Sequence, residues 1–373
     1  MKALIQLYEK VPSTKKAYLQ KIKEEFVIRC LPECQNAILF GCANLGVKIL
    51  DNFRREGINI LAFADNDRTK WGTCIENIPI ISPENIHGFP YSYIIITSKY
   101  VKDIHTQLCD LKIRKVLPHY VLSVLFPHKF PNTLYEGAYN FILNNRSKIE
   151  HVYTMLSDRK SKEIYIQIID FLLSLSPEKL PLAEKNQYFI DEFALSNNET
   201  YVDVGAFDGD TLKEFLRRRG IHFNKYFALE PDGESFNKLK NSIREYHNKR
   251  IIALRVAASS KNGYVYFSDT GKIDACVLKN GKNRVEAATT DKLFKKEVVT
   301  SLKIDVEGYE LHVLRGSKEI LKQHKPKLAV CVYHRPQHLW EIPLLIKSLN
   351  PDYKYFILRH HEEELSETVL YAI

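Results

Sequence analysis

The feature that most constrains the fold is a glycine-bearing turn between an apolar segment and a helical one. The sequence TYVDVGAFDGDT, which starts at Thr200, predicts a buried strand, a turn and then a helix. Glycine lets such a turn approach a ligand at the carboxyl end of the strand, where the helix N-terminus offers free N–H groups. Asp203 lies inside the strand, where a carboxylate needs turn amides or an ammonium group as partners. This arrangement is typical of doubly wound α/β domains.

A second acid supports an adenosine-bearing cofactor. The segment FALEPD ends the next predicted strand at Glu230, where this fold class uses an acid to accept hydrogen bonds from a ribose diol. The turn lacks the GxGxxG of dinucleotide folds, and Asp208 and Asp210 would repel a pyrophosphate. The residues therefore favour S-adenosylmethionine, which carries a sulfonium and an ammonium group, over NAD. The alternative is a tight turn and a surface acid in a domain that binds no cofactor.

The alternation of strands and helices predicts an α/β fold with two doubly wound units. We expect a helical N-terminal segment (1–32), a small Rossmann-like domain (33–120), a helical connector (121–190) and a seven-stranded class I methyltransferase fold (191–373). The strands expected in the last domain are 200–205, 225–230, 250–257, 301–305, 327–333, 354–358 and 367–373. Its expected helices are 211–219, 234–246, 309–324 and 339–349, and short β-like pieces replace a helix in 263–288.

Composition indicates the compartment and the binding partners that the protein is expected to have. No apolar run is long enough for a membrane span, and no secretory signal is evident. The 7 cysteines are scattered without zinc spacing, which indicates reduced thiols in a cytoplasmic protein. The net charge of +9 comes without a basic stripe or a nucleic-acid motif. We therefore expect no nucleic acid, but a solvated basic surface or a basic funnel for an anionic substrate. The sequence is compatible with a homo-oligomer.

Several longer segments resemble one family. DVGAFDGDT, FALEPD, RVAAS, SLKIDVEGYELHVLRGSKEIL and the tail segments KPKLAVCVYHRPQHLWEIPLLIKSL, YFILRHH and ETVLYAI resemble the FkbM methyltransferases over about residues 186–373. The resemblance implies an S-adenosylmethionine-dependent O-methyltransferase acting on a hydroxyl of a sugar, nucleotide sugar or glycan precursor. Bacterial surface-polysaccharide or glycoconjugate biosynthesis is the setting that it implies. A non-catalytic binding protein and a methyltransferase of a non-sugar small molecule remain as alternatives.

The resemblance also implies where the cofactor binds. The implied contacts are Asp203, Gly205, Ala206, Asp208, Gly209, Glu230, Pro231, Ala257 and Asp305. No clear acid follows the third strand to receive the adenine amino group.

Candidates for catalysis follow the carboxyl ends of the later strands, which face the cofactor. We expect His334 to be the general base, with Asp305 beside it. The expected substrate contacts are Glu307, Tyr333, His360 and His361. Glu310 is interpreted as a helix N-terminal acid, and His324 and His338 as surface or packing residues.

A divalent metal is the alternative to a general base. Asp305, Glu307 and His334 could hold manganese or magnesium, although histidine suits magnesium poorly, and we do not expect a metal.

The N-terminal unit carries a weaker signal. GCANLG supplies Gly41, Ala43 and Gly46 after a predicted strand, and Asp65 ends the next strand. The wider pattern resembles a Rossmann-like domain at the front of some bacterial sugar-modifying enzymes, which implies nucleotide or nucleotide-sugar binding at these four residues. A scaffold or dimerisation role is an equal alternative, and a redox role with NAD is the least supported.

Overall fold

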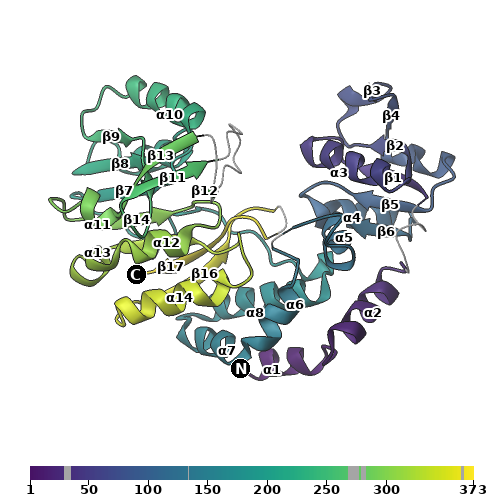
Figure 1. Cartoon of the computed structure of the whole chain (residues 1–373), viewed down its shortest axis with the longest axis horizontal. Coiled ribbons are helices and arrows are strands. Elements are labelled where there is room, and N and C mark those ends of the chain that lie inside the picture. Colours follow the sequence, from purple (N-terminus) through teal and green to yellow (C-terminus); the bar gives the residue numbers. More distant parts are fainter. Residues whose placement is uncertain (29–34, 133, 268–276, 279–282, 363–364) are drawn as a thin grey trace. The chain divides into compact units, whose positions relative to one another are not determined.

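The computed structural model describes all residues except 29–34, 133, 268–276, 279–282 and 363–364. The chain forms two compact units (Figure 1). The first contains Met1–Arg146, Tyr165–Leu182 and His361–Ser366, and the second contains Ser147–Ile164, Ala183–His360 and Glu367–Ile373. Among the described helices, none has the length and apolar character that crossing a bilayer requires.

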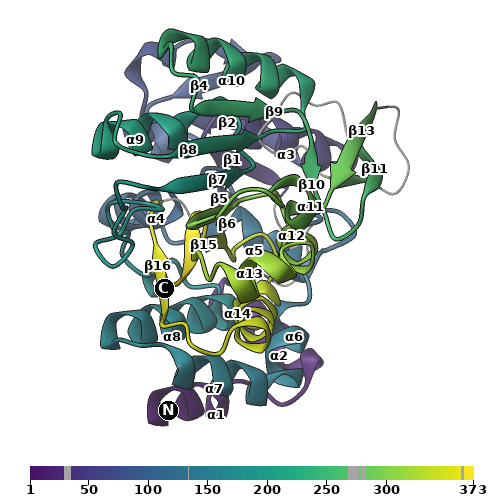
Figure 2. The ribbon, with the colours of Figure 1, turned by 90° about the vertical axis from the view of Figure 1, so that its left-hand side faces the viewer.

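The second unit is built on a seven-stranded sheet, which confirms the number of strands expected for it. Its order is β16-β17-β15-β14-β7-β8-β9. β17 pairs antiparallel with β15 and β16, and the other neighbouring pairs are parallel. The strands are β7 (Thr200–Val204), β8 (Lys225–Leu229), β9 (Ile251–Leu254), β14 (Ser301–Ile304), β15 (Lys327–Cys331), β16 (Tyr355–Arg359) and β17 (Thr368–Ala372). Figure 2 shows β9, β8 and β7 side by side. The parallel order places the carboxyl ends of β7, β8, β14 and β15 along one edge.

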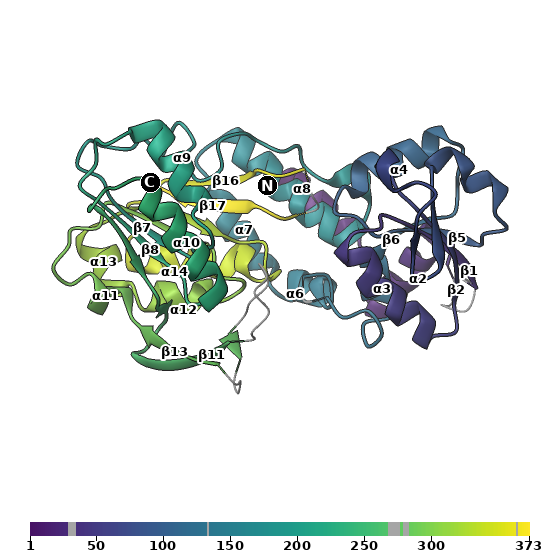
Figure 3. The same ribbon diagram turned by 90° about the horizontal axis from the view of Figure 1, so that it is seen from above.

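Helices cover both faces of this sheet. They are α7 (Arg146–Met155), α9 (Asp210–Arg219), α10 (Gly233–Glu245), α11 (Thr290–Leu293), α12 (Glu310–Arg315), α13 (Lys318–Gln323) and α14 (His338–Leu349). In Figure 3, α9 and α12 lie on opposite sides of β7 and β8. Because both faces are covered, β7 is buried at every position. The rings of Tyr201 in β7 and Tyr226 in β8 are stacked, with their centroids 5.2 Å apart.

The single helix expected over 309–324 is wrong, because the chain breaks between α12 and α13. A Cβ on Gly316 would lie 1.9 Å from the carbonyl oxygen of Ser259, so this residue packs directly against backbone. The Gly316 carbonyl oxygen accepts hydrogen bonds from the Asp291 amide and the Thr290 hydroxyl instead of a helical partner. These contacts turn the chain where periodicity alone predicts a continuous helix.

The strand expected over 250–257 is also divided. After β9, Ala257–Ala258 form β10 in a separate four-stranded sheet of order β10-β13-β11-β12. The other strands are β11 (Gly263–Phe267), β12 (Val277–Leu278) and β13 (Asn283–Ala288), and Figure 3 shows β11 and β13 apart from the large sheet. Short strands therefore replace a helix here, as predicted for the described part of 263–288.

The first unit has a six-stranded sheet of order β3-β4-β2-β1-β5-β6. Its strands are β1 (Asn36–Phe40), β2 (Asn59–Ala64), β3 (Cys74–Ile75), β4 (Ile78–Ile81), β5 (Tyr93–Ile96) and β6 (Val116–Pro118). Its helices are α1 (Lys2–Glu9), α2 (Lys15–Glu25), α3 (Asn44–Arg55), α4 (Val101–Asp110), α5 (His119–Leu125) and α6 (Ala138–Asn144), while α8 (Arg159–Ser174) spans the boundary between the units. The β3–β4 hairpin was not predicted, because its strands are too short to show alternation.

Candidate active site

The glycine turn after β7 is shaped by the neighbouring strand. Gly205 has φ 82°, and a Cβ on it would lie 1.8 Å from the carbonyl oxygen of Asp305, which follows β14. Glycine is therefore required because two strand ends approach each other, a reason that the sequence alone does not show. Gly209, with φ 94°, then precedes the first residue of α9.

A buried ion pair supports this turn from inside the sheet. Asp203 is fully buried, and its Oδ1 lies 3.0 Å from the Lys303 ammonium of β14. Tyr226 donates a hydrogen bond of 2.7 Å to Oδ2 of Asp203, and Lys303 donates one of 2.6 Å to the Gly205 carbonyl. Burial raises the pKa of Asp203 above its usual value, although Lys303 opposes the shift. The ammonium partner expected for Asp203 is thus Lys303, and Asp203 reaches the turn through it.

Glu230 holds the turn from the neighbouring strand. Its Oε2 accepts a hydrogen bond from the Phe207 amide and its Oε1 one from the Asp232 amide, both 2.9 Å long. Burial raises the pKa of Glu230 to about 7 despite these two donors. Each carboxylate oxygen keeps a second lone pair, so the group can still accept hydrogen bonds from a diol.

The remaining expected cofactor residues lie near these strand ends. Ala206 is buried after β7, and Asp208 lies in the same turn, half-buried. Pro231 follows Glu230 directly, and Ala257 is buried in β10.

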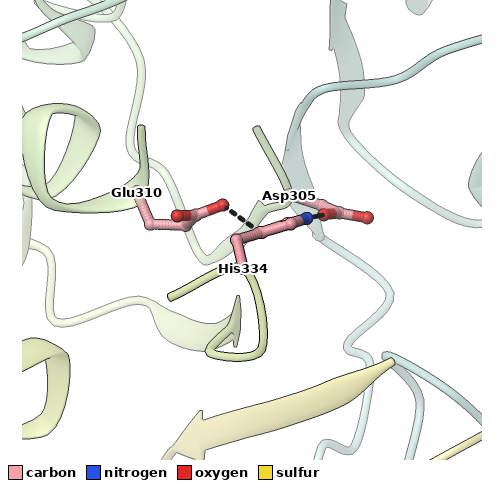
Figure 4. A group of neighbouring side chains, drawn as sticks. All are labelled: Asp305, Glu310 and His334. Atoms are coloured by element: carbon pink, nitrogen blue, oxygen red, sulfur yellow. Dashed lines mark ion pairs between the residues drawn. The ribbon is translucent and has the colours of Figure 1, made fainter. Parts of the chain in front are cut away.

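A carboxylate–histidine cluster lies at the ends of β14 and β15. His334 follows β15 and has a side chain only 8% exposed. Its Nε2 lies 3.3 Å from Oε2 of Glu307 and 3.7 Å from Oδ1 of Asp305, both in the segment after β14. Figure 4 shows the ring between Asp305 on one side and Glu310 on the other. The structure therefore brings together three of the residues expected to act on the substrate.

Glu310 is a helix N-terminal acid, as interpreted from the sequence, but its contacts extend beyond the helix. It is the first residue of α12, but its fully buried carboxylate faces two histidines. Its Oε1 lies 2.7 Å from Nδ1 of His334, and its Oε2 lies 3.1 Å from Nδ1 of the buried His338. Position in a helix cannot show this, because the partners come from a loop and from α14.

The carboxylates govern the charge of His334. Burial by itself lowers the pKa of His334, but Glu310, Glu307 and Asp305 outweigh it and raise the pKa well above its usual value. Burial in turn raises the pKa of Glu310, but His334 outweighs it, so that the Glu310 pKa lies well below its usual range. The pair is therefore ionised at neutral pH.

Tyr188 is a site residue that sequence reasoning missed. Its hydroxyl donates a hydrogen bond of 2.9 Å to Oδ2 of Asp305, and its ring centroid lies 5.1 Å from the Lys303 Nζ. The residue precedes β7 in an irregular segment, where no periodicity or motif marks it.

Tyr333 lines the same cluster. Its ring centroid lies 4.0 Å from that of His334, and its hydroxyl lies 3.3 Å from Oε1 of Glu367. Burial, followed by the charge of Asp305, raises the pKa of Glu367 to about 7. Tyr333 thus contacts the base candidate on one side and a half-buried acid on the other.

Neither of the two adjacent histidines joins this cluster. His360 Nδ1 lies 2.9 Å from the Glu184 carbonyl oxygen, and its Nε2 lies 2.7 Å from the Tyr371 hydroxyl. Both ring nitrogens are therefore used within the protein, and contact of His360 with the substrate stays a prediction. His361 belongs to the first unit, where its ring centroid lies 6.5 Å from that of Tyr100.

Two groups of side chains among the described residues could hold a metal ion. Asp305, Glu310 and His334 form one, and Asp305, Cys331 and Glu367 the other, with ligand atoms within 4.8 Å of one another. In the first group Glu310 faces Nδ1 of His334, and Asp305 faces Nε2 of the same ring. An ion bound to either nitrogen of His334 would therefore have only one of these two acids beside it.

In the first unit, the predicted nucleotide-site residues gather at the end of β1. Gly41 has φ 111°, and a Cβ on Gly46 would lie 2.1 Å from the Gly41 carbonyl oxygen. Asp65 accepts hydrogen bonds from the Cys42 amide and thiol and from the Asp67 amide. Asp65, the acid expected to contact a ribose, thus accepts hydrogen bonds from nearby backbone amides. Ala43 is the residue before α3, and its side chain makes no capping hydrogen bond. The described cysteines Cys42, Cys74, Cys109 and Cys331 are free thiols.

The sheet order, the glycine turn and the acid after β8 are consistent with a methyltransferase fold. Residues 203–357 match the family model described as the methyltransferase FkbM domain, and residues 33–117 match the model described as C2185-like, N-terminal. The chain therefore carries an FkbM methyltransferase domain and is a methyltransferase.

One solved structure shares the fold of the whole chain, and two others match about half of it with low TM-scores. A methyltransferase FkbM from Methylobacillus flagellatus KT is 20% identical with a TM-score of 0.76, and the match covers 100% of this chain and 97% of that one. An S-adenosylmethionine-dependent methyltransferase from Aquifex aeolicus is 16% identical with a TM-score of 0.30, over 48% of this chain and 85% of that one. An rRNA methylase from Streptococcus thermophilus is 11% identical with a TM-score of 0.30, over 48% and 86%. No curated protein matches the chain.

Proposed function

We propose that this methyltransferase transfers a methyl group from S-adenosylmethionine to a hydroxyl of a sugar, nucleotide sugar or glycan precursor. The observation that carries the proposal is the placement of two groups of residues on one edge of the sheet. The turn held by Asp203 and Glu230 ends β7 and β8, and the cluster around His334 ends the adjacent β14 and β15. A cofactor and an acceptor bound at these places would meet at Asp305, because its carbonyl oxygen lies against Gly205.

S-adenosylmethionine supplies a methyl group that is already activated by the sulfonium, so orientation of the acceptor matters most. A sugar hydroxyl is a poor nucleophile and must lose its proton as the oxygen attacks. In this proposal Asp305 and Glu307 orient the hydroxyl, and Nε2 of His334 accepts its proton. Since the free protein holds His334 in its charged form, the residue must first release a proton, and turnover should rise with pH.

The test is turnover with a panel of nucleotide sugars, simple sugars and non-sugar hydroxyl compounds, measured for the wild type, His334→Ala and His222→Ala. His222 is an exposed histidine away from the site and serves as the control. We expect His334→Ala to keep its affinity for S-adenosylmethionine. Its turnover should fall at least about 100-fold, which is the lower end of the rate enhancement that a general base contributes. Near-normal turnover of His334→Ala would remove it as the base, and methylation of only non-sugar acceptors would refute the substrate class.

The wider setting rests on the sequence. A cytoplasmic bacterial pathway for surface polysaccharide, a homo-oligomer and the division at residues 33–120, 121–190 and 191–373 remain proposals. Nucleotide-sugar binding by the first unit also remains one. Gly41 and Gly46 support it, whereas the occupied carboxylate of Asp65 favours the scaffold alternative.

A further inference from the structure

We infer that Glu310 is a positioning residue that, together with His338, fixes the orientation and the charge of His334. The inference rests on the proposed role of His334 in methyl transfer and deepens it. It assigns a function to two residues that the sequence gives only a helix-terminal and a packing role.

The first support is the geometry of the three side chains. The Glu310 carboxylate lies between the two imidazoles, with Oε1 2.7 Å from Nδ1 of His334 and Oε2 3.1 Å from Nδ1 of His338. All three side chains are at least nine-tenths buried. A contact at Nδ1 leaves Nε2 directed to the segment after β14, where the acceptor would lie. An acid that holds the distal nitrogen of a catalytic histidine selects its tautomer and its orientation.

The second support is charge. The charged groups around His334 are Glu310 on α12, Asp305 and Glu307 after β14, and Glu367 before β17. His338 on α14 contacts the other oxygen of Glu310. Glu310 is the carboxylate closest to His334 and the fully buried one, so its field is the least screened by solvent. Its removal should therefore lower the pKa of His334 more than removal of any other single acid.

A purely structural role is the competing explanation. Oε1 of Glu310 also accepts hydrogen bonds from the amides of Val306 (3.2 Å) and Gly308 (3.1 Å), which hold the loop after β14. Glutamine at position 310 keeps a carbonyl oxygen for these amides but removes the charge. Aspartate keeps the charge but shortens the side chain. The two substitutions therefore separate a loop contact from an effect on His334.

The experiment measures methyl transfer against pH for the wild type, Glu310→Gln, Glu310→Asp and the control Glu319→Gln, an exposed acid on α13. We expect Glu310→Gln to move the rising limb of the profile at least about one pH unit lower, with a lower plateau because the base is weaker. Glu310→Asp should retain the wild-type midpoint with reduced turnover, and affinity for S-adenosylmethionine should stay within about twofold in all variants. An unchanged midpoint in Glu310→Gln would refute the inference and leave a loop contact.

A readout without turnover keeps the test independent of the proposed function. The ring of His334 can be titrated by NMR in isotope-labelled full-length protein, with and without Glu310→Gln, and assigned with His334→Ala. A fall in the His334 pKa supports the inference even if no sugar acceptor is methylated. An unchanged pKa refutes it even if methylation is confirmed. Should Glu310→Gln not fold, the midpoint in Glu310→Asp decides: a shift of about one unit or more would overturn the role of the charge.

Discussion

The most quantitative prediction concerns Glu230 and the pH dependence of cofactor binding. The carboxyl has a pKa of about 7 in the free protein, because burial outweighs the hydrogen bonds that it accepts from two amides. A ribose diol would donate to the ionised form, so binding should draw a proton off Glu230. A carboxyl whose pKa is raised to about 7 is mostly protonated at pH 6 and mostly ionised at pH 8. Affinity should therefore fall as the pH decreases below 7.

The size of the effect follows from this one pKa. If only the ionised carboxylate binds, the apparent dissociation constant at pH 6 is about 10-fold that at pH 8. Binding should release about 0.9 proton per chain at pH 6 and about 0.1 at pH 8.

Isothermal titration with S-adenosylmethionine at pH 6, 7 and 8, in buffers of different ionisation enthalpy, measures both quantities. Glu230→Gln is the matched control, because it keeps the shape of the side chain but cannot titrate. Ionisation of the ligand itself affects the wild type and the variant equally. Equal pH dependence in the two proteins would refute the reasoning about Glu230.

Three further predictions test the support of the site. Gly205→Ala should lower the free energy of unfolding in urea by at least about 2 kcal/mol, because φ 82° and a contact of 1.8 Å with the Asp305 carbonyl oxygen both oppose a Cβ. An unfolding free energy equal to that of the wild type would contradict this prediction. Asp203→Asn should cost about 3–5 kcal/mol in the same assay and weaken cofactor binding, since Lys303 stays buried without its partner; retained affinity would refute the role of this pair. Chelation with EDTA should leave turnover unchanged, and a loss restored by Mn²⁺ would place an ion beside His334.

The sequence predicts those parts of the fold that depend on local pattern. The seven strands of the second unit follow from apolar runs and from glycine at the turn, and the order of the sheet follows from the class that they resemble. The local pattern gives no information on contacts between segments that are distant in the sequence. Gly316 breaks a helix because of a backbone contact with Ser259, and Gly205 is needed because of Asp305.

The candidate site shows the same division. His334, Asp305 and Glu307 could be expected at one edge because each follows a parallel strand. Tyr188, Glu310 and His338 could not, since a hydroxyl reaching Asp305 or a carboxylate between two histidines depends on side-chain directions in packed elements. The partners of His360 could not be expected either, because they lie in a loop and in β17.

Isothermal titration of the purified chain with S-adenosylmethionine measures whether the second unit binds the cofactor. We expect binding at one site per chain, weakened in Asp203→Asn and retained in His334→Ala. Absence of binding by the well-folded protein would contradict the assignment of the second unit as the cofactor domain.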